Sequence, residues 1–298
     1  CMLDWNTPKL SDKEWIEKCV KESQYIGSDA AFANIYLLRS KYNIKVTYYK
    51  DLLIRYYEGL GNRKGYTFPL GRKDVLSALY AIEQDAKQMN RPLEFCFVTE
   101  EQKEILENTF AGRTESSSDA GDYDYIYGQP ELSLLSGRTY HKKKNHVSKF
   151  KRTYEDYMFC EIGNGNLDDV MIIEEWYYDR LQQDDTSAMK EYEAIREAVD
   201  NFEELSLSGG IIYANNVPVA MTIASYINDA AVDIHFEKAV GEYAVNGGFA
   251  AINQMYASTL KDVKFINREE DINIPGLRKA KESYHPKFML KKYGVRVK

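Results

Sequence analysis

The chain has 298 residues, of which 44% are hydrophobic and 29% charged, and its formal net charge is −7. This length suits two domains better than one, and the apolar content excludes a disordered chain. Apolar runs are too short for a membrane span and the first residues lack a signal-peptide pattern, so we expect a cytoplasmic protein without a transmembrane segment. The four cysteines have no metal-ligand or disulfide spacing, and we expect them to be buried apolar residues without a metal; Cys1 is assigned no role.

Residues 1–130 are predicted to form the first half. Ser11-Asp12 caps a helix that ends near Ser23. Three runs rich in β-branched and aromatic residues then predict an antiparallel meander, because such residues favour strands. The expected elements are strands at 44–50, 52–57 and 66–70, a helix at 73–89, a strand at 93–98, a helix from Thr99 to 110, a loop at 111–122 and a strand at 123–128.

A basic helical connector, residues 131–153, leads to the second half, residues 154–298. Asn tolerates positive φ, so Asn215-Asn216 and Asn228-Asp229 each predict a two-residue hairpin turn between three antiparallel strands. The expected elements of this half are a strand at 157–162, helices at 169–181 and 187–205, strands at 209–214, 217–227 and 230–239, a helix at 248–260, a strand at 263–267 and a helix at 276–284.

Both halves contain a three-stranded meander followed by alternating helices and strands. This repetition favours an internal duplication, in which each half has a mixed central sheet flanked by helices in an α+β, layered arrangement. The alternative is a generic α+β protein that contains two meanders.

Three titratable residues alternate along the strand at 230–239. Alternation places Asp233, His235 and Glu237 on one face, where neighbours lie close enough to serve a substrate as acid, base or orienting group. The alternative is the solvated outer face of an antiparallel sheet. Because helices are expected on both faces, a polar row fits a place where the sheet opens into a cleft.

Two groups of residues around this strand could bind anions. Gly247 and Gly248 begin a helix whose amide groups could hold phosphate, or they simply provide the helix entry. Polar residues also follow the strand at 263–267, and cations lie on the helix after them; they could hold phosphate or carboxylate groups or form a salt-bridge network. These residues are Asn267, Arg268, Glu269, Arg278, Lys281 and Tyr284.

The stretch from Arg138 to Arg152 contains no acidic residue, although the protein is acidic overall. Such a run could line a groove for a polyanion, such as the acceptor end of tRNA or an anionic lipid head group. The alternative is a solvated basic helix. The candidate polyanion-binding residues are Arg138, His141, Lys142, Lys143, Asn145 and His146.

Several segments carry a resemblance to a known family: LSGRTYHKKKNHVSKF, DIHFEKA, GGFAAINQ, INREED and GLRKAKESYHP. Together they resemble bacterial proteins similar to the C-terminal domain of phosphatidylglycerol lysyltransferases. The resemblance implies a tandem GNAT fold related to the Fem-type peptidoglycan aminoacyltransferases, and relatives that move an amino acid from aminoacyl-tRNA to a lipid head group. Matched positions in the donor and acceptor region are Gly276-Leu277-Arg278, Lys281, Tyr284, Pro286 and Tyr293.

The GNAT resemblance also bears on coenzyme A. GNAT enzymes bind its pyrophosphate at a Q/R-x-x-G-x-G/A signature, which here reads VNGGFA with Val245 in place of Gln or Arg. The hypothesis from the sequence is an acyl or aminoacyl transferase that works by direct attack of an amine or hydroxyl on a donor, either acyl-coenzyme A or aminoacyl-tRNA. The alternatives are a non-catalytic GNAT-fold module that binds tRNA or another polyanion, and an acetyl-coenzyme A-dependent N-acetyltransferase.

Overall fold

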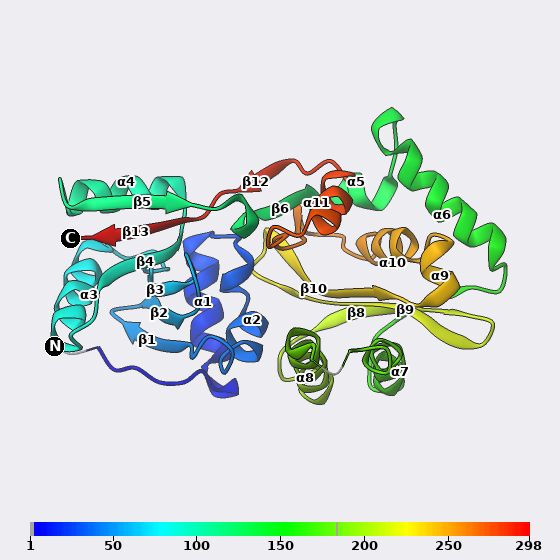
Figure 1. The fold of residues 1–298 in the computed structure, drawn as a ribbon, viewed down its shortest axis with the longest axis horizontal. Helices are drawn as coiled ribbons and strands as arrows, with labels where there is room; N and C mark the ends of the chain where they lie inside the picture. The colour runs from blue at the N-terminus through cyan, green and yellow to red at the C-terminus, as the bar shows by residue number, and fades with distance from the viewer. Residues whose placement is uncertain (1–2, 183) are drawn as a thin grey trace. The chain divides into compact units, whose positions relative to one another are not determined.

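The computed structural model describes residues 3–182 and 184–298, which divide into two compact units (Figure 1). Unit 1 holds the chain up to Tyr125 together with Glu269–Lys279 and Phe288–Lys298. Unit 2 holds Ile126–Arg268 and Ala280–Lys287. The predicted boundaries were therefore wrong for the C-terminal region, because its last strand pairs within the sheet of unit 1. Cys1 lies outside the described residues.

The sheet of unit 1 has the strand order β1-β2-β3-β4-β13-β5. The predicted loop at 111–122 was wrong, because Thr114–Ser118 is a strand that pairs antiparallel with Tyr293–Val297. The bounds of the strands are β1 Lys45–Tyr49, β2 Leu52–Glu58, β3 Lys64–Thr67, β4 Leu93–Val98, β5 Thr114–Ser118 and β13 Tyr293–Val297. The short strand β12, Phe288–Leu290, is not one of the strands of this sheet.

Helices α1 (Lys13–Ser23), α3 (Leu76–Gln88) and α4 (Glu100–Thr109) confirm the helices predicted for the first half, whereas α2 (Phe32–Leu37) was not predicted. Thr99 caps α4 with its hydroxyl, which accepts a hydrogen bond from the amide of Gln102 at 3.2 Å. The apolar face of α3 packs on the sheet, where Leu79 and Ile82 are fully buried. Short 3₁₀ helices lie at Leu10–Asp12, Ser28–Ala30, Ala120–Asp122 and Arg138–Tyr140.

The strands of unit 2 run in the order β6-β11-β10-β9-β8-β7. Only β10 and β11 are parallel within this order; the other neighbours are antiparallel. The bounds are β6 Asp124–Gly128, β7 Met158–Glu161, β8 Ser208–Ala214, β9 Val217–Tyr226, β10 Ala231–Ala239 and β11 Phe265–Asn267.

Helices cover both faces of this sheet, as expected. Figure 1 shows α7 and α8 on one face of β8–β10 and α10 on the other. Helix α6, the predicted connector, packs on α10 through a small apolar cluster that includes Val147 and Ala250. Among the described residues, no helix is long and apolar enough to cross a bilayer. The helix bounds are α5 Gln129–Leu134, α6 His141–Thr153, α7 Leu167–Tyr178, α8 Thr186–Asp200, α9 Gly241–Val245, α10 Gly248–Ala257 and α11 Pro275–Glu282.

The two Asn-containing turns differ. Asn215 and Asn216 have φ values of 54° and 63°, which confirms the two-residue turn between β8 and β9. The turn after β9 was predicted wrongly: the amide of Ile227 donates to the carbonyl of Ala231 at 2.9 Å, so residues 228–230 form a three-residue loop. The side chain of Asn228 stabilises this loop by accepting from the amide of Ala230 at 2.9 Å.

Candidate functional site

The sheet of unit 2 opens beside β10. This strand pairs with β11 only over Ala231–Asp233, whereas its pairing with β9 continues to Ala239. From Ile234 onward, none of the described strands pairs with the other edge of β10. The sequence predicted an opening of the sheet at this place.

A β-bulge lies at the start of this opening. Ile234 lies opposite Ala224 and Phe236 opposite Ile223, so His235 is the extra residue. Bulges re-aim side chains, because every residue after them changes face relative to a regular strand.

The bulge separates the three predicted catalytic residues. Asp233 lies opposite Ser225 and Glu237 opposite Thr222. Residues opposite each other share a face, and residues three apart on β9 lie on opposite faces. The prediction that Asp233, His235 and Glu237 share one face was therefore wrong for Glu237.

On one face, Asp233, His235 and Ser225 form a hydrogen-bonded chain. The His235 Nδ1 lies 3.0 Å from Oδ2 of Asp233, and the His235 Nε2 lies 2.6 Å from Oγ of Ser225. The side chains of His235 and Asp233 are 1% and 0% exposed. A carboxylate at Nδ1 favours a proton on that nitrogen, so Nε2 accepts from the serine hydroxyl. Ser225 was not predicted as a site residue.

On the other face, Glu237 pairs with Arg268. An Nη of Arg268 lies 2.9 Å from Glu237, whose second oxygen accepts from the amide nitrogen of Asn253 on α10 at 2.9 Å. The Arg268 and Glu237 side chains are only 12% and 11% exposed. The Arg268 charge is thus balanced by Glu237, and an incoming anion would share or displace that partner.

Aromatic rings and a second cation surround Arg268. Its guanidinium carbon lies 4.6 Å from the centre of the Tyr284 ring, and the Lys143 ammonium lies 4.3 Å from the same centre. Burial lowers the pKa of Lys143, and the charge of Arg268 lowers it further. Lys281 donates to the carbonyl of Arg268 at 2.5 Å. The fold thus brings predicted binding residues together with one residue of the connector.

Packing explains the glycines at the start of α10. Gly247 has φ of 98°, and a Cβ there would lie 2.3 Å from the carbonyl oxygen of His146 on α6. A Cβ on Gly248 would lie 2.6 Å from the carbonyl oxygen of Tyr243. The close approach of α6 therefore requires Gly247, and phosphate binding at these amides stays a prediction.

Asn267, another predicted binding residue, is fully buried at the end of β11.

The basic connector residues are mostly exposed on α6 and the turn before it. His146 is half-buried, and its pKa is lowered by burial and by neighbouring lysines, first Lys143. The exposed members of the predicted set are Arg138, His141, Lys142 and Asn145. The structure therefore agrees with a solvated basic helix and leaves its charges accessible to a partner.

Two predicted residues belong to unit 1. Glu269 accepts from the side-chain amide of Asn34 at 2.9 Å. Arg278 makes a bidentate pair with Asp271 at 2.8 and 2.9 Å. For Arg278 the structure thus shows the ion-pair alternative, with its guanidinium charge already balanced by a buried carboxylate.

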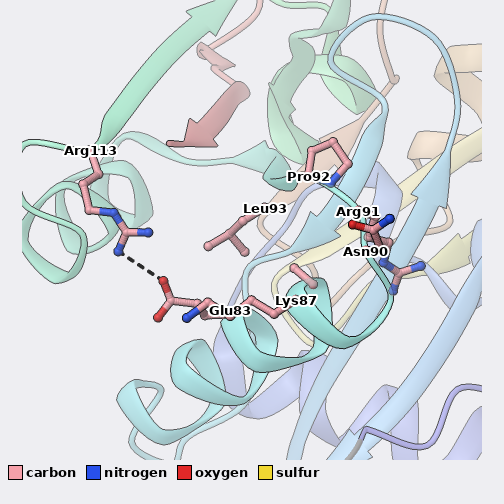
Figure 2. Close-up of a pocket in the computed structure, with 8 residues that line it drawn as sticks. Glu83, Lys87, Asn90, Arg91, Pro92, Leu93 and Arg113 are labelled. Atoms are coloured by element: carbon pink, nitrogen blue, oxygen red, sulfur yellow. Dashed lines mark hydrogen bonds and ion pairs between the residues drawn. The ribbon is translucent and has the colours of Figure 1, made fainter.

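A cleft of about 470 Å³ in unit 1 lies apart from the predicted residues (Figure 2). It is bounded by α3, the turn at Asn90–Pro92 and Arg113. Its arginines are engaged: Arg113 pairs with Glu83 at 3.1 Å, and Arg91 with Asp85 at 3.0 Å. We do not assign the chemistry to this cleft, because none of the predicted site residues lines it.

Two α/β units, each with a mixed sheet flanked by helices, define a tandem GNAT-type fold. A family model described as phosphatidylglycerol lysyltransferase, C-terminal, matches residues 21–296, and the chain belongs to this family.

Solved structures agree with this family. A conserved protein from Bacteroides thetaiotaomicron is 30% identical, with both chains fully covered and a TM-score of 0.92. The L-PGS of Bacillus licheniformis shares the fold at 14% identity, with 96% of this chain and 92% of that chain covered and a TM-score of 0.67. FemX shares it at 9% identity, with 99% and 98% covered and a TM-score of 0.62. No curated protein matches the chain.

Proposed function

We propose that this chain transfers an acyl or aminoacyl group from an activated ester or thioester to an amine or a hydroxyl. Its membership of the lysyltransferase C-terminal family supports an aminoacyl transferase. The observation that carries the proposal is the buried pair of His235 and Asp233 at a bulge, beside the edge where β10 loses its partner β11.

His235 fits the role of general base better than Glu237 does. Asp233 holds the imidazole through Nδ1 and stabilises the imidazolium that forms when Nε2 takes a proton. In Glu237, by contrast, one carboxylate oxygen pairs with Arg268 and the other accepts from Asn253. Glu237 therefore serves to position Arg268.

The cations around Tyr284 provide a place for the donor or acceptor anion. Arg268 and Lys143 both lie against this ring, and they would contact a phosphate or carboxylate group. The donor would be an aminoacyl-tRNA or an acyl-coenzyme A, and the acceptor an amine, a hydroxyl or a lipid head group. The amides at Gly247–Gly248 would contact phosphate.

The test is mass spectrometry of the chain after incubation with a pool of charged tRNAs and acyl-coenzyme A thioesters, followed by transfer assays with the donor that is retained. General-base catalysis is worth about 10²- to 10⁴-fold, so we expect His235→Ala to lower turnover by that factor. His285→Asn is the control, because His285 is exposed and takes no part in the proposed transfer. Full turnover in a folded His235→Ala variant would contradict the assignment of His235 as the general base.

A second candidate is a non-catalytic module that binds a polyanion, and the exposed basic residues of α6 favour it. Affinity for tRNA would then fall steeply with salt, because each neutralised phosphate releases a counterion. Turnover with a small thioester would change far less. Calorimetry with coenzyme A tests the third candidate, an acetyl-coenzyme A-dependent N-acetyltransferase.

A further inference from the structure

Ser225, His235 and Asp233 stand in the order of a serine nucleophile, its base and an orienting carboxylate. Oγ of Ser225 lies 2.6 Å from Nε2 of His235, and Nδ1 lies 3.0 Å from Asp233. These are the distances at which a hydroxyl is activated by an adjacent imidazole. Such arrangements are recognised by geometry and role rather than by sequence position.

The hydrogen bonds of His235 decide which proton it can take. Nδ1 faces the carboxylate of Asp233, which leaves Nε2 as the basic nitrogen, and Nε2 already accepts from Ser225. An acceptor amine could use this base directly only by displacing the serine hydroxyl. The hydroxyl of Ser225 is therefore the group that His235 is placed to deprotonate.

Two strands and a bulge create this geometry. The pairing of β9 with β10 puts Ser225 opposite Asp233, and the bulge turns His235 back toward both of them. A serine that merely completed a strand would need neither the bulge nor a buried carboxylate behind the imidazole. Ser208, also in this sheet, shows the simpler arrangement, because its hydroxyl bonds to that of Tyr256 at 2.5 Å with no imidazole.

We propose that Ser225 is a nucleophile that carries the acyl group during transfer. Its Oγ bonds to the donor carbonyl carbon and its proton moves to Nε2 of His235; the ester C–O or thioester C–S bond then breaks, and the leaving atom takes that proton. The acceptor next attacks the Ser225 ester and gives its proton to Nε2. Oγ leaves with this proton, so the enzyme is restored without any oxidant or metal.

Burial sets a condition on this route. Ser225 is 4% exposed, so the donor reaches it only when neighbouring groups move aside. The open edge of β10 begins at the next residue after Asp233. A small reagent that reaches Ser225 will report the nucleophile.

Diisopropyl fluorophosphate tests the nucleophile directly on the full chain, since it bonds to an activated serine oxygen and releases fluoride. Intact-mass and peptide analysis should find one adduct, on Ser225. His235→Gln and Asp233→Asn should slow its formation by about 100-fold or more. Ser208→Ala is the matched control and should react at the wild-type rate. A folded wild-type chain without an adduct on Ser225, or equal rates in His235→Gln, would overturn the inference.

The covalent route rests on the proposed function, because its second step needs the acceptor of the proposed transfer. The covalent route and the proposed function can nevertheless fail separately. If Ser225→Ala stays folded and transfers the acyl group at the wild-type rate, the covalent route is wrong while the transferase stands. If His235-dependent labelling of Ser225 occurs but no acceptor is acylated, the nucleophile is supported and the transferase is contradicted.

Discussion

Arg268 and Glu237 are 31 residues apart in the chain, yet an Nη of the first lies 2.9 Å from a carboxylate oxygen of the second. The pair crosses the opening of the sheet, because Glu237 stands on β10 and Arg268 follows β11. It therefore spans the place where main-chain pairing between these strands has ended. Its loss should affect both the stability of unit 2 and the shape of the opening.

We expect Glu237→Ala to lower the free energy of unfolding by about 3 kcal/mol, because it leaves the charge of Arg268 nearly buried without its partner. Glu237→Met combined with Arg268→Met should restore most of the loss. Urea denaturation measures both variants. Asp200→Ala, which removes the exposed Arg196–Asp200 pair, is the control and should leave the midpoint almost unchanged. A loss below about 1 kcal/mol for Glu237→Ala would contradict this prediction.

Gly247→Ala should destabilise the protein by more than about 1 kcal/mol, because the residue has positive φ and its Cβ would collide with the His146 carbonyl. Gly165 has no such neighbour within 4 Å, so Gly165→Ala serves as the control. Thermal unfolding compares the two. Equal melting temperatures would show that α6 yields without cost and that packing does not explain Gly247.

Asp29 in unit 1 should make the free energy of unfolding depend on pH in the acid range. Burial by itself raises its pKa, but the charges of Lys292 and Arg55 outweigh this and lower the pKa to about 2. A depressed pKa contributes stability above the unfolded value near 4, and this stability is lost as pH falls toward 2. We expect a contribution of about 2 kcal/mol.

The measurement is urea unfolding of the wild type and Asp29→Asn between pH 5 and pH 2. Asp29→Asn should be less stable at pH 5, and the difference between the two proteins should shrink toward pH 2. Carboxylates that do not share Lys292 or Arg55 with Asp29 titrate alike in both proteins and cancel in this difference. A difference that is constant with pH would show that Asp29 has no depressed pKa.

Local patterns predicted most elements of the fold but missed others, among them β5 and β13. The run from Thr114 to Ser118 is polar and largely exposed, so nothing in its composition favours a strand over a loop. It becomes a strand by pairing with residues near the other end of the chain. Such long-range pairing leaves no local periodicity from which it could be read.

In the candidate site, too, local patterns predicted some residues and missed one that depends on strand pairing. The strand at 230–239 and its titratable residues were evident, whereas the serine opposite them was not. A two-residue turn at Asn228-Asp229 would have placed Ser225 opposite Val232. The three-residue loop shifts the register by one and places it opposite Asp233.

The sequence by itself determined which segments are apolar, where positive φ is tolerated and which strand carries an acid, a base and a second acid, because these are properties of neighbouring residues. Only the tertiary structure decided which side chains these residues contact. The bulge at His235 moved Glu237 to the face of Arg268 and left Asp233 with Ser225, because a one-residue change in strand register inverts which side chains meet.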